Sequence, residues 1–227
     1  MLRVFIGYDH RQPVAFQVAA HSIWKHASHP VSVTRLQLNQ LPLVKTGLTE
    51  FTYSRFLVPY LCQYQGTAVF VDSDFLCRAD INELFAYPLA FPETAVFVTK
   101  NAKRFEWPSL MVFNNPKCTA LTPAYIEANQ CFDFAWAESV GALPPAWNHL
   151  VGYDAPNPDA KMVHFTQGIP CWPETKECEF SKEWAKALKE TVSTTDFKTL
   201  MGKSVHAKPV YDRLKQREHA AATAPTV

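Results

Sequence analysis

The chain has 227 residues, of which 48% are apolar and 13% aromatic, enough to bury a sizeable core in one large domain, or in one domain with an appendage. The formal net charge is only +1, and no block of like charges stands out, which argues against a nucleic-acid-binding protein. The seven glycines are too far apart to form a G-x-G-x-x-G or Walker loop. The charge of any phosphorylated ligand must therefore be neutralised by something other than the backbone N–H groups of a glycine-rich loop.

The six cysteines are scattered, and none forms a C-x-x-C pair. This usage suggests a reducing compartment and argues against a zinc site. The apolar run at residues 1–6 is too short for a signal peptide, and no run approaches membrane-spanning length. We therefore expect a cytoplasmic protein without a transmembrane segment. The sequence leaves the oligomeric state open.

The first forty residues predict a βαβ unit. Residues 2–7 form an apolar strand, a helix begins at Pro13 with Trp24 expected to anchor it to the sheet, and residues 31–38 form a second strand. Such a unit implies a parallel sheet, whose ligands bind beyond the carboxyl ends of the strands. The pair Tyr8-Asp9 follows the first strand at such an end.

The chain is organised around an apolar strand at residues 67–71, which ends in Asp72, Ser73 and Asp74. Two unpaired carboxylates at the tip of a buried strand are strongly disfavoured, and a divalent cation bound through oxygen is the simplest compensation. In the alternative interpretation, one aspartate caps the next helix and the other is solvated. Because these acids and Tyr8-Asp9 both follow strand ends, we expect them to face the same ligand.

Several other polar residues admit both a structural and a functional interpretation. Arg55, in the first turn of an expected helix, either forms a structural salt bridge or reaches the acidic site or a ligand phosphate. Asn114, at the end of an expected strand, either holds sugar hydroxyls or belongs to a turn. His164, in the last expected strand, either is a satisfied core residue or supplies a nitrogen ligand to the metal. Asp80 fits a helix N-cap and is expected to be structural.

The composition shifts near the C-terminus. Residues 181–218 alternate Lys and Glu with a few large apolar side chains, which predicts a solvated helical extension. Residues 219–227 are expected to be disordered. No internal repeat or low-complexity linker divides residues 1–180, which we expect to form one α/β domain.

These motifs together resemble the retaining glycosyltransferases of family 8, the glycogenin-like and bacterial galactosyltransferase-like enzymes. The resemblance covers residues 2–172 and implies the GT-A fold, with a single Rossmann-like, mixed but mainly parallel sheet flanked by helices. Residues 1–180 would then be a nucleotide-sugar transferase domain. The segments that carry the resemblance are the opening strand with Tyr8-Asp9, Tyr53-Ser54-Arg55-Phe56, the D-x-D motif Asp72-Ser73-Asp74, Leu143-Pro144 with Trp147-Asn148, and the H-x-x-x-G-x-x-x-W element from His164 to Trp172.

The resemblance implies transfer of a sugar from a nucleotide-diphosphate donor, expected to be a uridine one, to a glycan or another hydroxyl acceptor, with retention of configuration. Asp72, Asp74 and His164 would bind manganese, or magnesium, which would bridge the diphosphate of the donor. The residues expected to contact the donor are Tyr8 and Asp9 at the base and ribose, Arg55 near the phosphates or the sugar, Gly168 and Trp172 in the phosphate-side loop, and Ser73 and Asn114 beside them.

The sequence departs from the family pattern at two places. Ile169-Pro170-Cys171 replaces the lysine that usually precedes the tryptophan, which puts direct lysine contact to the diphosphate in doubt. The family often places an acidic or amide residue before Leu143, on the donor-sugar face opposite the leaving group. Asp133 and Glu138 are the nearest candidates for this catalytic role, in addition to Arg55.

Two other functions compete with a transferase. In a phosphatase of the haloacid-dehalogenase type, Asp72 would be the nucleophile and Asp74 the acid. A non-catalytic sugar-nucleotide or glycan-binding module would instead stack aromatic rings on sugars. The candidate rings for such stacking are Phe75, Trp107, Trp136 and Trp147.

Overall fold

The computed structural model describes residues 1–191 together with Asp212 and Gln216, which are both helical. The chain divides after Leu188 into two compact units. The predicted helical and disordered parts of the tail beyond residue 191 lie outside the described residues, apart from those two helical positions.

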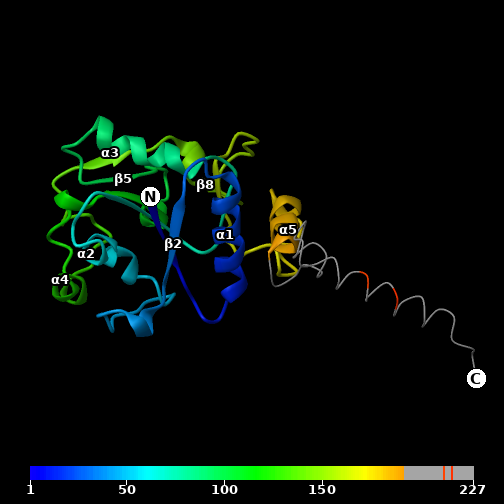
Figure 1. Cartoon of the computed structure of the whole chain (residues 1–227), viewed down its shortest axis with the longest axis horizontal. Coiled ribbons are helices and arrows are strands. Elements are labelled where there is room, and N and C mark those ends of the chain that lie inside the picture. Colours follow the sequence, from blue (N-terminus) through cyan, green and yellow to red (C-terminus); the bar gives the residue numbers. More distant parts are fainter. Residues whose placement is uncertain (192–211, 213–215, 217–227) are drawn as a thin grey trace, which may run out of the picture. The chain divides into compact units, whose positions relative to one another are not determined.

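The main sheet has six strands in the order β2-β1-β3-β6-β5-β7. Neighbouring strands are parallel in the pairs β1–β2, β1–β3 and β5–β7, whereas β6 is antiparallel to both β3 and β5. This arrangement confirms the predicted α/β fold with a mixed, mainly parallel sheet (Figure 1). The strand bounds are β1 (Leu2–Gly7), β2 (Val31–Leu36), β3 (Thr67–Val71), β5 (Val96–Val98), β6 (Leu110–Asn114) and β7 (Val140–Ala142).

Alternate side chains of the central strands supply two apolar cores, because successive residues of a strand point to opposite faces of the sheet. Val4 and Val69 belong to the core that includes the inner face of α1 (Pro13–His26). Phe5 and Phe70 belong to the core on the other face. Figure 1 shows α1 on one side of β2, and α2 (Val58–Leu61) and α4 (Pro123–Ala128) on the other side.

Trp24 does not anchor α1 to the sheet, and that prediction is wrong. Its side chain is 54% exposed. The helix packs instead through Ala19, Ala20 and Ile23. An Ile and a Trp at successive helical positions lie about 100° apart around the helix axis, so only one of them can face the sheet.

A second, smaller sheet forms immediately after the acidic motif. It has three strands, β4 (Phe75–Cys77), β9 (Met162–His164) and β8 (His149–Leu150), in the order β4-β9-β8. The β4–β9 pair is antiparallel, and Phe75 lies opposite His164. This register places the end of the chain segment 72–74 beside a residue that is about ninety positions away in the sequence.

The remaining helices are short. Asp80 caps η3 (Ile81–Phe85), because its carboxylate accepts a hydrogen bond from the backbone N–H of Asn82 at 3.0 Å, and its predicted structural role is confirmed. No helix within residues 1–191 is both long and apolar enough to cross a membrane. The bounds of these helices are η1 (Leu38–Gln40), η2 (Ser54–Leu57), η3 (Ile81–Phe85), α3 (Ala86–Ala90), η4 (Arg104–Ser109), η5 (Asn115–Lys117), η6 (Pro145–Trp147) and α5 (Ser181–Glu190).

Candidate functional site

The two polar strand ends predicted to meet do lie at the same edge of the main sheet. Strands β1 and β3 are parallel neighbours, with Ile6 opposite Val71. Tyr8-Asp9 and the acidic motif 72–74 therefore leave the sheet side by side. Both Asp9 and Asp72 are buried, so these carboxylates line the interior of this edge and not its open surface.

Asp72, Asp74 and His164 converge at this edge. Each offers one ligand atom, and these three atoms all lie within 4.8 Å of one another. The Nε2 atom of His164 is 3.3 Å from the Oδ1 atom of Asp74. The imidazole is buried and stacks on the ring of Phe75, with ring centroids 4.3 Å apart and planes 17° apart. The pairing of β4 with β9 thus both delivers the histidine and fixes the plane of its ring.

Arg55 is buried beside this cluster and pairs with one of its carboxylates. Its Nη1 atom is 3.1 Å from Oδ1 of Asp72 and donates to the carbonyl oxygen of Pro108 at 3.0 Å. The same guanidinium lies over three aromatic rings, those of Phe51, Phe70 and Phe132. Arg55 therefore forms a salt bridge, and through it reaches the acidic site, as one part of the functional interpretation predicted. Contact with a ligand phosphate stays a prediction. The arginine acts on the ligand cluster through Asp72.

The electrostatics of the cluster favour a cation. Burial raises the pKa of Asp72 from 3.8 to about 7, with Arg55 opposing the rise and Asp74 adding to it. Burial alone would lower the pKa of His164, but the Asp74 carboxylate, followed by Asp72 and Glu106, raises it above its ordinary value. Oδ1 of Asp72 and Oδ1 of Asp74 are both buried. The first is paired with Nη1 of Arg55 at 3.1 Å, and the second with Nε2 of His164 at 3.3 Å. Carboxylate oxygens and an imidazole nitrogen are ligand types that divalent metals bind, so these three residues form a candidate metal site.

Metal binding at this site is expected to weaken as the pH falls from about 8 to about 5. A proton on Asp72, whose folded pKa of about 7 lies above the unfolded 3.8, removes a ligand charge, and His164 must lose a proton before Nε2 can bind. In the metal-free protein Asp72 holds its proton more tightly when folded than when unfolded, so the free energy of unfolding falls as the pH rises from 3.8 to about 7. Above this range a bound cation offsets the loss. The increase in melting temperature caused by Mn²⁺ should therefore be large near pH 8 and vanish near pH 5. If Mn²⁺ raised the melting temperature equally at both pH values, the assignment of Asp72 and His164 as metal ligands would be contradicted.

Two residues beside the cluster were not singled out in the sequence as functional. Oε2 of Glu106 lies 3.9 Å from Nδ1 of His164, and the side chain of Asn148 approaches the same nitrogen at 3.1 Å. Glu106 belongs to η4, an irregular helix before β6 that carries no periodic signal. Asn148 was noticed only as part of a segment resembling family 8.

The structure does not bring all the predicted site residues to the cluster. Asn114 lies opposite Thr67, at the end of β3 away from Asp72, where its amide donates to the carbonyl of Pro92 at 2.7 Å. Asp133 is exposed, and its carboxylate accepts from the backbone N–H of Ala135 within its own turn at 3.0 Å. Glu138 is also exposed and precedes β7, whose first residue pairs with the end of β5 nearer to Asn114. None of these three side chains has a contact with the metal-ligand cluster in the described structure.

Ser73 belongs to the acidic motif, and Gly168 and Trp172 belong to the segment that follows His164. Ser73 is buried between the two aspartates in the chain. The segment leading to Gly168 is tied to the motif, because the backbone N–H of Phe165 donates to the carbonyl of Asp74 at 3.0 Å. Gly168 has a φ of +115°, which favours glycine, and a Cβ there would lie 3.2 Å from the ring of Trp172. The indole of Trp172 is half exposed.

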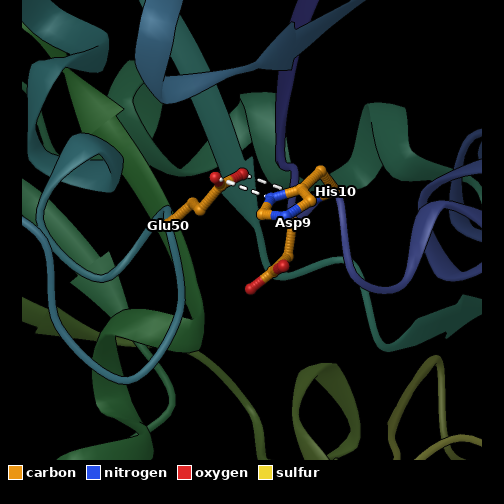
Figure 2. A group of neighbouring side chains, drawn as sticks. All are labelled: Asp9, His10 and Glu50. Atoms are coloured by element: carbon orange, nitrogen blue, oxygen red, sulfur yellow. Dashed lines mark hydrogen bonds and ion pairs between the residues drawn. The ribbon is translucent and has the colours of Figure 1, made fainter.

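A second group of potential ligands, Asp9, His10 and Glu50, lies at the end of β1 (Figure 2). His10 Nδ1 is 2.8 Å from Oε1 of Glu50, which ties the loop after β1 to the loop around residue 50. Each of the three residues offers one ligand atom within 4.8 Å of the other two. The carboxylate of Asp9 is held by the guanidinium of Arg11, whose Nε donates to Oδ1 of Asp9 at 2.8 Å. This hydrogen bond is the largest cause that lowers the pKa of Asp9. Asp9 is thus paired with Arg11, and His10 with Glu50.

The aromatic rings considered for sugar stacking are largely unavailable. Phe75, Trp136 and Trp147 are buried, with at most 5% of each residue exposed, and only Trp107 is partly accessible. Core packing is therefore their role, and the observation that supported a purely glycan-binding module is lost.

Comparison with known proteins gives a family and a set of related folds. The family model described as "Glycosyl transferase family 8" matches residues 4–122. "Protein CDI" of Arabidopsis thaliana is 35% identical over 225 residues, a match that covers 83% of this chain and 86% of that protein.

Three solved glycosyltransferase structures share the fold. The bifunctional enzyme WbbM superimposes with a TM-score of 0.63 at 17% identity, over 85% of this chain and 50% of that one. GlyE of Streptococcus pneumoniae TIGR4 gives a TM-score of 0.61 at 14% identity, over 92% and 64%. The galactosyltransferase LgtC, in complex with donor and acceptor sugar analogs, gives 0.56 at 9% identity, over 87% and 99%. At these identities the likeness concerns the fold alone.

Proposed function

Because the chain belongs to glycosyl transferase family 8, we propose that this glycosyltransferase moves a sugar from a nucleotide-diphosphate donor to a hydroxyl acceptor with the help of a divalent cation. The GT-A fold and the family resemblance predicted from the sequence are both confirmed. The observation that carries the proposal is the convergence of Asp72, Asp74 and His164, each of which offers one ligand atom within 4.8 Å of the other two.

The cation, which we propose to be manganese or magnesium, supplies a Lewis acid for the negative charge that collects on the diphosphate as the glycosidic bond breaks. Asp72, Asp74 and Nε2 of His164 would hold it. The salt bridge from Arg55 holds the carboxylate of Asp72 in position. Three protein ligands leave the remaining coordination positions to the donor and water, as expected of a site that must admit a substrate.

The donor would lie along the edge where β1 and β3 end. We propose that Tyr8 and Asp9 line the base and ribose, with Ser73 beside them, and that Gly168 and Trp172 border the diphosphate. The guanidinium of Arg35 lies 4.6 Å above the ring of Tyr8, which fixes that ring in position. A uridine nucleotide and retention of configuration are proposed from the resemblance to family 8.

The acceptor is proposed to be a glycan or another hydroxyl compound. Because the chain belongs to a glycosyltransferase family, we do not propose the phosphatase activity. The salt bridge between Asp72 and Arg55 also disfavours Asp72 as a nucleophile. All six cysteines are free thiols, which supports the proposal of a cytoplasmic location.

A thermal-shift panel of nucleotides and nucleotide sugars, each with and without Mn²⁺, tests the proposal. We expect one nucleotide-diphosphate sugar to raise the melting temperature by about 5 °C or more at saturating concentration, and only when Mn²⁺ is present. The same shift with Mn²⁺ omitted would contradict the metal-dependent site. No shift with any nucleotide sugar would contradict the donor class.

A further inference from the structure

Asn148 is a buried amide between η6 and β8, and 1% of the residue is exposed. It touches the metal-ligand cluster from the side opposite Asp74. Its Oδ1 atom lies 3.1 Å from Nδ1 of His164, and its Nδ2 atom donates to the main-chain carbonyl of Glu106 at 3.1 Å. The side chain therefore bridges a fixed backbone group and the imidazole.

The backbone carbonyl decides which way this amide points. A carbonyl oxygen can only accept a hydrogen bond, so the NH₂ group of Asn148 must face Glu106. The reversed amide would place two acceptor oxygens against each other in a buried site, which is strongly disfavoured. Oδ1 of Asn148 thus faces His164, and because Oδ1 is itself only an acceptor, Nδ1 of the imidazole must carry the proton.

The position of this proton determines what the other ring nitrogen can do. With a hydrogen held at Nδ1, the nitrogen available to bind a cation is Nε2, which is the atom 3.3 Å from Asp74. Phe75 fixes the plane of the ring by stacking, and Asn148 fixes its rotation within that plane. A hydrogen bond to the second nitrogen of a metal-binding histidine commonly fixes the tautomer and the orientation of the ring, and so strengthens metal binding.

We propose that Asn148 is a positioning residue that holds the Nδ1 proton of His164 and so directs Nε2 toward the cation. The proposal rests on the proposed metal-dependent function. The chain of contacts runs from the Glu106 carbonyl through the Asn148 amide to the imidazole, and no step of it requires the donor sugar.

Two variants separate the hydrogen bond from the packing at this position. Asn148→Leu has a similar size and cannot accept, whereas Asn148→Asp keeps an acceptor oxygen. Asn115→Leu is the matched control, because Asn115 is equally buried and its amide donates to the carbonyl of Gln65 at 3.0 Å, at the other end of β3. Binding of Mn²⁺ to the full chain is measured by the loss of the free-ion EPR signal. We expect Asn148→Leu to weaken binding about 10- to 100-fold, Asn148→Asp to weaken it less, and Asn115→Leu to leave it unchanged.

The second measurement is a ¹H–¹⁵N NMR spectrum of the histidine rings of the wild-type chain near neutral pH, recorded without metal and with Mg²⁺. We expect a proton on Nδ1 of His164 in both spectra. A ring without that proton overturns the proposal even if the leucine variant does not fold. Unchanged Mn²⁺ affinity in Asn148→Leu, or equal losses in the leucine and aspartate variants, overturns it as well. A wild-type chain that binds no Mn²⁺ would instead contradict the proposed function, and the spectrum would still decide the role of Asn148.

Discussion

Asp74→Asn is expected to lower the rate of sugar transfer from a nucleotide-diphosphate donor by at least about 10³-fold, equal to about 4 kcal/mol of transition-state stabilisation. The substitution removes one of the two carboxylates proposed to bind the metal and keeps the size of the side chain. The fold should survive, because the charge of Asp74 is one of the causes that raise the pKa of its buried neighbour Asp72, and removing it relieves that repulsion. Release of the nucleoside diphosphate and the far-UV circular dichroism spectrum measure the two effects.

Asp159→Asn is the matched control for this experiment. Asp159 is an exposed carboxylate on the segment that leads into β9, the strand of His164, and it lies outside the ligand cluster. Its loss should leave the rate within about twofold of wild type, as is usual for surface substitutions. Full activity of Asp74→Asn in the presence of a chelator would remove the metal from the mechanism.

Trp147→Ala is expected to lower the free energy of unfolding by about 3–5 kcal/mol. The indole is 1% exposed and belongs to the core that also contains Phe75, Leu143 and Met162. Because domains of this kind have a total stability of about 5–15 kcal/mol, the loss would be a large fraction of the whole. The midpoint of urea unfolding measures it.

Trp24→Ala provides the comparison within the same chain. Trp24 is half exposed on the outer side of α1, so its removal leaves little cavity and should cost less than about 1 kcal/mol. If Trp24→Ala destabilised the protein as much as Trp147→Ala does, the assignment of one tryptophan to the core and the other to the surface would be wrong.

The larger elements of the fold follow from local sequence patterns. The first strand, the helix beginning at Pro13 and the strand ending in the acidic motif are all present where they were predicted. Their positions depend on apolar runs and on a proline at the first helical turn, and both signals lie within a few neighbouring residues. The common edge of Tyr8-Asp9 and the acidic motif follows from the parallel pairing alone.

The parts that could not be predicted depend on contacts between distant segments. Strand β4 has three residues, too few for any periodicity, and only its pairing with β9 defines it. Without that pairing, the sequence left open whether His164 was a core residue or a ligand. In the structure it is buried and also faces Asp74.

Arg55 and Glu106 illustrate the same limit for charged residues. A sequence pattern places Arg55 in a first helical turn but does not reveal that three aromatic rings surround its guanidinium. Glu106 sits in a short 3₁₀ segment, and only the fold brings its carboxylate to His164. Conversely, Asn114 fits a ligand role by type, but the antiparallel direction of β6 carries it to the other end of the sheet.

The proposed metal ligands come from two different sheets. Asp72 directly follows β3 of the six-stranded sheet, whereas His164 belongs to β9 of the three-stranded one. A cation held by both would act as a cross-link between two separately hydrogen-bonded layers, and its binding energy would add to the cohesion of the folded chain. The supply of the ion would then govern the lifetime of the enzyme as well as its turnover.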